Sequence, residues 1–492
     1  MFEQFKRLFR NSAIYTAGNI LNRSTALISM PVLTRYLAPA EYGILSVVSA
    51  LVTALSFIYY LGLRGSATRF YYDLNSAIER RNYFSSLFFF LIGAAALLTT
   101  LLVIFGDTLL APLLKGEVPF HPYMDIAVVT LVFGTFSVLP SVLMRVKEQA
   151  ALFVTVEFAR ATGITALSVL FVVVGGLGAL GPLLASLTVT ACAAVYFVYY
   201  LRPYLGPIFH WAAIGQSLVF GVPTISERLC WWVLNASNRI WLLQYVSLSA
   251  AGIYTVSHSM GFALQLVGGA INSAWTPFFY AIARDRTKQE ARQMFSYTAT
   301  YYTLAVVFFG LALALFAHEV FRILASDRYL AGLPIVPWVI GAAILETLYD
   351  IPSRGLYLMK RTQLLPLIMV AAAVVTTVLN ALLIPSWGLV GAAVATLTGY
   401  ATLLAVTLGV SQRIYFVPYQ YLRLGKIFLA AGTVYAATLW LSPAALLAGI
   451  LIKAAALVCF PLVLYAIGFF EKAELSRAGE LVRATLRNKE IP

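Results

Sequence analysis

Long apolar stretches separated by short polar joints run along the chain from Ile14 to Phe469. A helix of about 20 apolar residues spans the ~30 Å hydrocarbon core of a bilayer. Because lipid offers the backbone no hydrogen-bond partners, such stretches fold as helices. The pattern predicts an all-α polytopic membrane protein with about fourteen transmembrane helices. The expected spans are residues 12–34, 41–63, 84–105, 123–144, 152–174, 179–200, 212–235, 247–271, 295–317, 333–355, 364–384, 388–410, 426–441 and 446–469.

Composition and charge agree with this pattern. Hydrophobic residues make up 61% of the chain and charged residues 11%. Of the 34 basic residues, 25 lie in joints on one side of the predicted membrane and five on the other. Because cytoplasmic loops carry the excess of Lys and Arg, we expect both termini in the cytoplasm and the protein in the cytoplasmic (inner) cell membrane. The net charge of +14 mostly reflects this bias. No basic soluble domain is present to bind nucleic acid, and no residue spacing predicts a metal site.

The chain repeats itself at an offset of about 210 residues. Residues 177–188 and 387–398 match at five of twelve positions, and Gly43-Ile44 corresponds to Gly252-Ile253. Each repeat holds six spans, so both halves enter the membrane from the same side, as in a parallel repeat. The sequence therefore predicts two pseudo-symmetric six-helix lobes that face a central cleft. The expected divisions are an N-terminal lobe at 1–205, a C-terminal lobe at 206–415, and a helix pair with a cytoplasmic tail at 416–492.

The segment from Met30 to Gly43 resembles the first external joint of polysaccharide-exporter (Wzx-type) flippases, a branch of the multidrug/oligosaccharidyl-lipid/polysaccharide exporter superfamily. The Gly-x-x-Gly starts of spans six and twelve, and the segment Asn235-Ala236-Ser237-Asn238-Arg239, are similar to that branch too. The usual pair at the end of this segment is Asp-Arg, so Asn238 departs from the pattern and puts an acidic role there in doubt. The resemblance implies that a polyprenyl-pyrophosphate-linked oligosaccharide moves from the cytoplasmic to the periplasmic leaflet by alternating access. Membrane lipids, a polysaccharide polymerase and glycosyltransferases are the further partners that it implies.

Charged residues inside the spans are candidates for a substrate cavity, because each costs ~2.5–3.5 kcal/mol on insertion scales. Arg23 shares a polar helical stripe with Thr16 and Asn19, and its guanidinium suits a pyrophosphate. In span seven, Arg228, Trp232, Asn235 and Arg239 could bind phosphate and sugar, although an interfacial Trp belt is the alternative. The substrate-binding prediction therefore contains these seven residues: Thr16, Asn19, Arg23, Arg228, Trp232, Asn235 and Arg239.

The remaining intramembrane charges suggest other roles. Glu346 and Asp350 lie four residues apart on one helical face, which suits coupling to H⁺ or Na⁺; Asp350 could instead pair with a basic residue one turn on. Glu157 and Arg160 are spaced for an ion pair or a gate. Lys453 could line a groove for the lipid tail or snorkel to the interface. Apart from a coupling ion, no cofactor is expected.

Two other function classes were weighed against a flippase. A proton- or sodium-coupled multidrug or organic-cation exporter of the same fold is the alternative, and it would favour a cavity of carboxylates and aromatic rings. An enzyme that uses polyprenyl substrates would need a sizeable external loop with catalytic groups. The longest expected external joint, 106–122, carries few such residues, and the sequence holds no nucleotide-binding loop or nucleophile triad. We therefore do not expect an enzyme.

Overall fold

A computed structural model describes residues 2–207, 209–441, 446–471 and 474 of the chain; among them, the side chains of residues 2–13, 19, 23, 26, 274, 277 and 446 are outside the description. The described residues form helices and no strand, which confirms the all-α fold. In the first half of the chain the elements are α1 (Phe2–Tyr36), α2 (Pro39–Tyr60), α3 (Leu63–Tyr71), α4 (Ala77–Leu114), α5 (Tyr123–Thr135), α6 (Val138–Val146), α7 (Ala150–Val169), η1 (Leu170–Val174), α8 (Leu180–Leu201) and η2 (Arg202–Tyr204).

The second half of the chain ends with a helix pair, α18 and α19, that has no counterpart in the predicted repeat. Its elements are α9 (Trp211–Gly221), α10 (Pro223–Asn235), α11 (Asn238–Tyr245), α12 (Leu248–Ser259), α13 (Gly261–Asp285), α14 (Lys288–Leu315), α15 (Ala317–Leu324), η3 (Asp327–Ile335), α16 (Val336–Leu358), α17 (Leu364–Ile414), α18 (Tyr421–Trp440) and α19 (Leu446–Ala466). The two predicted spans 364–384 and 388–410 fall on the single helix α17, which is interrupted at Gly388 by a left-handed φ of 53°.

Each predicted span lies on a helix or on two consecutive helices, and the protein is a multi-pass membrane protein. Within the described ranges, ten helical segments are long and apolar enough to cross a bilayer by length and composition. The number fourteen stays a prediction, since this criterion takes α17 as one segment and leaves out α1 and the broken helices α9 to α13.

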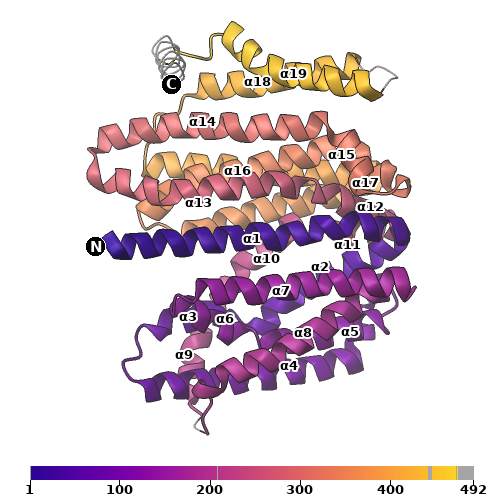
Figure 1. The fold of residues 1–492 in the computed structure, drawn as a ribbon, viewed down its shortest axis with the longest axis vertical. Helices are drawn as coiled ribbons and strands as arrows, with labels where there is room; N and C mark the ends of the chain where they lie inside the picture. Colours follow the sequence, from indigo (N-terminus) through magenta and orange to yellow (C-terminus); the bar gives the residue numbers. More distant parts are fainter. Residues whose placement is uncertain (1, 208, 442–445, 472–473, 475–492) are drawn as a thin grey trace, which may run out of the picture.

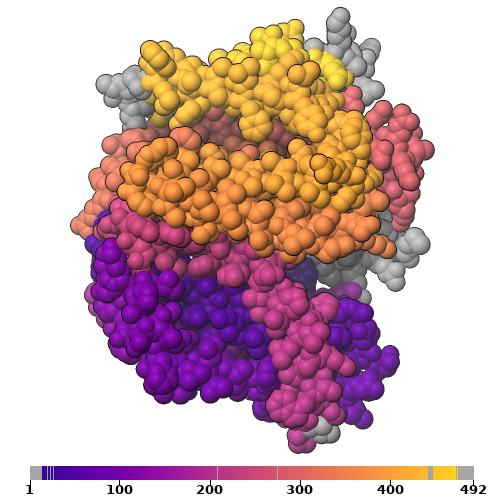
Figure 2. Space-filling view, turned by 180° about the vertical axis from the view of Figure 1, so that it is seen from behind, coloured from indigo at the N-terminus to yellow at the C-terminus, as the bar shows by residue number. Residues whose placement is uncertain are grey.

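The helices run side by side, with the early and late parts of the chain in separate groups (Figure 1). The helices α2 to α8 lie in one half of the view and α13 to α17 in the other, while α1 lies along the boundary. The helix α1 packs most closely on α7 and also touches α13 and α15. From behind, the pair α18 and α19 forms the edge farthest from the N-terminal half (Figure 2).

Predicted spans seven and eight are broken in the middle, as span four is between α5 and α6, and each piece packs mainly on a different partner. Span seven is divided into α9, which contacts α3 and α4, and α10, which contacts α17 and α2. Span eight is divided into α12, which packs on α2, and α13, which packs on α14 and α16. The chain after residue 206 therefore returns to the N-terminal helices before it joins its own group. The predicted domain boundaries stay a prediction.

The crossing of α2 and α12 joins the two halves at the end of the molecule that holds the α1–α2 joint. The glycines that the repeat pairs, Gly43 and Gly252, both lie in it. A Cβ on Gly43 would lie 2.0 Å from Leu248 O, and a Cβ on Gly252 would lie 2.1 Å from Pro39 O. The crossing is also hydrogen bonded, because Ser46 Oγ contacts Thr255 Oγ1 and donates to Ala251 O at 3.3 Å. Only glycine lets the two backbones approach this closely.

One ion pair fixes the C-terminal helix pair to the rest of the fold, and two others lie within the C-terminal segment. Lys453 Nζ of α19 lies 2.6 Å from Glu319 Oε1 of α15. At the opposite end, Arg423 of α18 lies 3.2 Å from Glu471 Oε1 and 2.9 Å from Glu474 Oε2. The guanidinium also lies over the ring of Phe469, 4.5 Å from its centroid. These contacts tie the segment after α19 back onto the start of α18.

Candidate binding site

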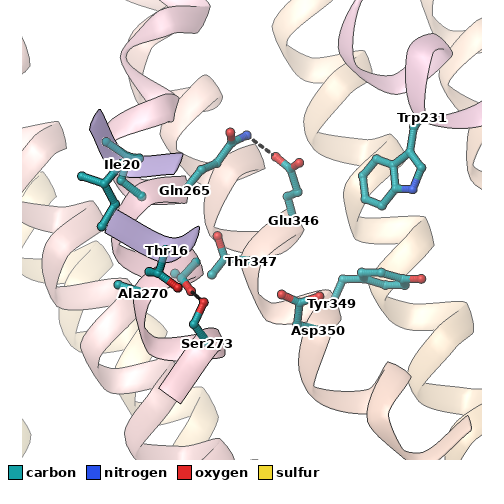
Figure 3. A pocket seen from close by; sticks show the side chains of 13 residues that line it. Thr16, Ile20, Trp231, Gln265, Ala270, Ser273, Glu346, Thr347, Tyr349 and Asp350 are labelled. Carbon is teal, nitrogen blue, oxygen red and sulfur yellow. Dashed lines mark hydrogen bonds between the residues drawn. The ribbon is translucent and has the colours of Figure 1, made fainter. Parts of the chain in front are cut away.

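A cavity of about 350 Å³ lies between α1, α10, α13 and α16 (Figure 3). We call it the acidic pocket, because two carboxylates, those of Glu346 and Asp350, line it. Its lining residues are Thr16, Ile20, Trp231, Gln265, Leu266, Gly268, Gly269, Ala270, Ser273, Glu346, Thr347, Tyr349 and Asp350. The volume falls in the lower part of the roughly 300–1,000 Å³ range of small-molecule sites.

Side-chain amides of α13 hold both carboxylates. Gln265 Nε2 donates to Glu346 Oε2 at 2.6 Å, and Asn272 Nδ2 donates to Asp350 Oδ2 at 2.7 Å. The same Asn272 accepts a hydrogen bond from Arg354 Nη2 at its Oδ1 atom. The amide therefore bridges Asp350 and Arg354, the pair that the sequence offered as an alternative to ion coupling. Because Gln265 and Asn272 are seven residues apart, they lie on one face of α13 and meet carboxylates that are four residues apart on α16.

Aromatic rings form the other side of the acidic pocket. In Figure 3, Glu346 and Asp350 lie between Gln265 on one side and Trp231 and Tyr349 on the other. The Trp231 ring meets the Tyr349 ring edge-on, with centroids 6.0 Å apart, and lies 6.3 Å from the ring of Tyr400. The pocket thus combines hydrogen-bond acceptors with flat apolar surfaces.

A second group of charges, which we call the basic wall, contains Arg64, Arg145, Arg160 and Arg228. The charges of Arg145, Arg228 and Glu157 all act on the guanidinium of Arg64. Those of Arg64, Arg160 and Glu157 act on Tyr60 at the end of α2. Within the group, Arg160 Nη2 lies 3.0 Å from Glu157 Oε2. The four guanidinium groups outnumber the carboxylate of Glu157 and that of Glu148, which acts together with Arg145 on Tyr15, so the basic wall keeps a net positive charge.

The helix α10 separates the basic wall from the acidic pocket. Its consecutive residues Glu227 and Arg228 point in different directions, about 100° apart on a helix. The charge of Arg228 acts on Arg64 in the N-terminal half. The charge of Glu227 acts on Tyr349 and Tyr357 of α16. The interior therefore carries positive charge toward the N-terminal half and negative charge toward the C-terminal half.

The structure places the predicted substrate residues at several sites. Thr16 lines the acidic pocket, and Arg228 is exposed beside the basic wall. Trp232 does not line the pocket: its Nε1 donates to Ala50 O at 2.8 Å, so it packs on α2, and the neighbouring Trp231 lines the pocket instead. Asn235 donates to Trp231 O at 3.0 Å.

Arg239 is half-buried at the α2–α12 crossing, where its Nε donates to Thr255 Oγ1 at 3.0 Å. It does not line the acidic pocket. Its neighbour Asn238 is 1% exposed. Asn238 Nδ2 donates to Tyr254 Oη at 2.8 Å and to Thr396 Oγ1 at 2.6 Å, while its Oδ1 accepts from Asn380 at 2.7 Å. Neutral groups make up this network, and a carboxylate in place of Asn238 could not make the two donations.

Other predicted residues are separate from the pocket or outside the description. The side chains of Asn19 and Arg23 are not among those that the structure describes, although the backbone of α1 places Arg23 two turns beyond Thr16. Glu157 and Arg160 form an ion pair at the basic wall. Lys453 forms its ion pair with Glu319, far from the acidic pocket in sequence and on other helices.

Several residues of the acidic pocket are absent from the predicted site, among them Trp231, Gln265, Ser273 and Tyr349. A signal was present for α13, since Gln265, Asn272, Ser273 and Thr276 are polar residues in an otherwise apolar span. Arg64 and Arg145 were counted only as joint charges that set the topology.

Comparisons with known proteins agree on family and fold. The sequence profile of the family described as polysaccharide biosynthesis protein matches residues 8–283. No curated protein matches the sequence. The fold is similar to that of the lipid II flippase MurJ in an inward closed conformation, with a TM-score of 0.72 and 13% identity, and the match covers 92% of this chain and 99% of that chain.

Two transporters of drugs share the fold as well. An inward-facing multidrug resistance MATE family transporter of the MOP superfamily matches with a TM-score of 0.60 and 13% identity over 82% of this chain and 95% of that chain. The MATE multidrug transporter DinF-BH matches with a TM-score of 0.52 and 16% identity over 84% of this chain and 96% of that chain. At these identities the similarity shows a common fold.

Proposed function

Because the chain belongs to the polysaccharide biosynthesis protein family, we propose that it is a flippase that moves a polyprenyl-pyrophosphate-linked oligosaccharide across the membrane for the synthesis of a surface polysaccharide. The family and the fold are those of MOP-type transporters, not of enzymes. The proposal adds the substrate and the direction, from the cytoplasmic to the periplasmic leaflet.

The observation that carries the proposal is the basic wall. Arg145 and Arg228 both act on the charge of Arg64, and Glu157 is the carboxylate that acts on it together with them. Clustering like charges in a membrane protein is costly unless an anion compensates them. A pyrophosphate suits this arrangement, because each guanidinium can form two parallel hydrogen bonds to phosphate oxygens. Arg23, two turns beyond Thr16 on α1, is proposed as a further pyrophosphate contact.

Movement of the two halves supplies the transport step in this proposal. The tight α2–α12 crossing would close the periplasmic end while the substrate enters beside the basic wall. Separation of α2 from α12 would then release it on the other side. The orientation follows from the excess of basic residues on one side of the predicted membrane, in the N-terminal segment, in alternate joints and in the tail, and both termini are therefore proposed to be cytoplasmic.

The energy source belongs to the proposal too. Glu346 and Asp350 are proposed to couple transport to H⁺ or Na⁺, because two carboxylates on one helical face favour binding a cation between them or sharing a proton. A polymerase or glycosyltransferases that consume the exported glycan would be the functional partners.

Export of organic cations is the second candidate function, and the acidic pocket is the observation that favours it. Its carboxylates and its Trp231 and Tyr349 rings could hold a flat cation. This candidate gives no role to the basic wall, however, which would repel such a substrate. We therefore rank it second.

Transport by purified protein in vesicles tests the proposal. Arg64→Gln and Arg228→Gln should each slow the movement of a fluorescent polyprenyl-pyrophosphate saccharide by at least about tenfold, since each removes charge-assisted phosphate hydrogen bonds of about 1.5–3 kcal/mol. Arg202→Gln is the matched control, because Arg202 is an exposed arginine outside the basic wall. Normal lipid movement in both variants, or export of organic cations by the wild type without any lipid movement, would refute the proposal.

A further inference from the structure

We propose that the acidic pocket holds a sugar unit of the lipid-linked substrate and selects sugars that offer hydroxyl or ammonium donors while excluding sugars that carry a carboxylate. The inference rests on the proposed function and deepens it, because it assigns the glycan to the C-terminal half and the pyrophosphate to the basic wall.

The polar groups at the surface of the acidic pocket include carboxylates and hydroxyl groups. Carboxylate oxygens come from Glu346 and Asp350, and hydroxyl groups come from Thr16, Ser273 and Thr347. Carboxylates accept hydrogen bonds and cannot donate them when ionised, and hydroxyl groups do both. The polar lining therefore suits a ligand rich in O–H or N–H donors, which describes a sugar.

Hydrogen bonds from α13 fix the positions of the two carboxylates. Gln265 donates to Glu346 at 2.6 Å, and Asn272 donates to Asp350 at 2.7 Å while it also binds Arg354. The amides hold the carboxylates through hydrogen bonds, and Arg354 acts on Asp350 from outside the pocket lining. Acceptors held in this way present their oxygens to a ligand in a fixed orientation.

The aromatic side of the acidic pocket and the volume of the pocket both suit a sugar. Trp231 and Tyr349 present ring surfaces opposite Gln265 (Figure 3), and rings of this type pack on the C–H face of a sugar while its hydroxyl groups bind the polar side. A cavity of about 350 Å³ has room for one or two sugar rings, not for a long glycan. The pocket would thus examine a short part of the substrate.

The two carboxylates of the acidic pocket would exclude acidic sugars. The carboxylate of a uronic acid in this cavity would lie close to those of Glu346 and Asp350, and like charges a few ångströms apart repel strongly where water is scarce. Specificity by repulsion is common at sites that must reject a close analogue. None of the basic-wall arginines lines the pocket, so none supplies a counter-charge at its surface.

The experiment compares three synthetic substrates with one polyprenyl-pyrophosphate and different sugars: glucosamine, glucose and glucuronic acid. In vesicles, the wild type should move the glucosamine and glucose lipids at least about tenfold faster than the glucuronic acid lipid. The double variant Glu346→Gln and Asp350→Asn should bring the three rates within about threefold of one another. Both substitutions keep an oxygen that accepts from Gln265 or Asn272, so the pocket should retain its shape.

Two further variants separate this inference from its alternatives. Asp285→Asn removes an exposed carboxylate at the end of α13, outside the pocket, and should leave the preference unchanged. Arg64→Gln should slow all three substrates and keep their ratio.

Three outcomes would overturn the pocket assignment. The first is equal movement of all three lipids by the wild type. The second is an unchanged ratio of the three rates in the double variant, whether or not all three rates fall together through loss of ion coupling at these carboxylates. The third is a wild type that moves none of the lipids, and this result would refute the proposed function together with the inference.

Discussion

Adding one methyl group at Gly252 is expected to open the crossing between α2 and α12. A Cβ there would lie 2.1 Å from Pro39 O and 2.8 Å from Gly43 N, and neither backbone atom can rotate away. The helices must move apart, which also disturbs the hydrogen bonds of Ser46. Overpacking costs about 1–3 kcal/mol, and a bias of this size shifts the ratio of open to closed states by roughly 5- to 150-fold.

The assay is the reaction of an introduced cysteine with a membrane-impermeant maleimide on intact cells. Ser46→Cys places the thiol at a position that is 2% exposed in the closed crossing. The native cysteines are first replaced by alanine; they are Cys192, Cys230 and Cys459. Adding Gly252→Ala should raise the labelling rate of the introduced thiol by a factor within the range above. The matched control is Gly425→Ala on α18, where an added Cβ meets no atom within 4 Å.

An unchanged labelling rate in a well-folded Gly252→Ala variant would refute the reasoning, because it would mean that the helices absorb the methyl group without separating. An equal rise with Gly425→Ala would point to general loosening of the fold. The unfolding temperature of each variant, measured in detergent, shows whether the comparison is between folded proteins.

Substitutions at three further contacts are tested by unfolding in detergent. Arg423→Leu should cost at most about 1.5–3 kcal/mol, reduced by solvent screening. Burial raises the pKa of its partner Glu474, but hydrogen bonds outweigh this effect and leave the pKa below its ordinary value of 4.5. The stability that the carboxylate supplies is therefore present above pH 4.5 and is lost as the pH falls through the lowered pKa. Glu474→Gln should flatten that part of the pH profile of stability. Asn238→Asp should destabilise by at least about 2 kcal/mol, because a carboxylate cannot make the two donations of the buried amide; a stability equal to that of the wild type would contradict the assigned network. Lys453→Met and Glu319→Gln should be non-additive, and additive losses would argue against a coupled pair.

The all-α membrane fold could be predicted because the bilayer fixes helix length, and each predicted span indeed lies on helical residues. The packing partners of the broken spans seven and eight could not. In span seven, Pro223 begins α10 and marks the break in the sequence, but both pieces of each span are apolar. Each piece packs on partners distant in sequence, such as α9 on α3 and α12 on α2. A hydropathy profile holds no information about those partners.

Helical spacing placed Glu346 and Asp350 on one face, and both line the same cavity. Spacing alone did not give the rotation of α10, and so Trp232 was chosen although Trp231 lines the pocket. The rotation depends on where α10 packs against α2 and α17. The partner of Lys453 is 134 residues away in the chain, beyond any local rule. The sequence thus indicated which residue types form a site, and the packing of the helices decided which members face it.

The separate positions of the basic wall and the acidic pocket bear on how the protein could bind a substrate with an anionic part and a donor-rich part. Had the arginines and carboxylates lined a single wall, they would have formed ion pairs with one another, and a substrate would have to break these pairs before it could bind. Among the described residues, no ion pair joins the basic wall to the acidic pocket. Glu227 and Arg228 extend this division into α10 itself, because each acts on the charges and rings of its own side. A substrate with an anionic part and a donor-rich part can therefore satisfy both sides at once. A simple anion or a simple cation would leave one of them uncompensated, and for this reason the arrangement favours a lipid-linked saccharide over an organic cation.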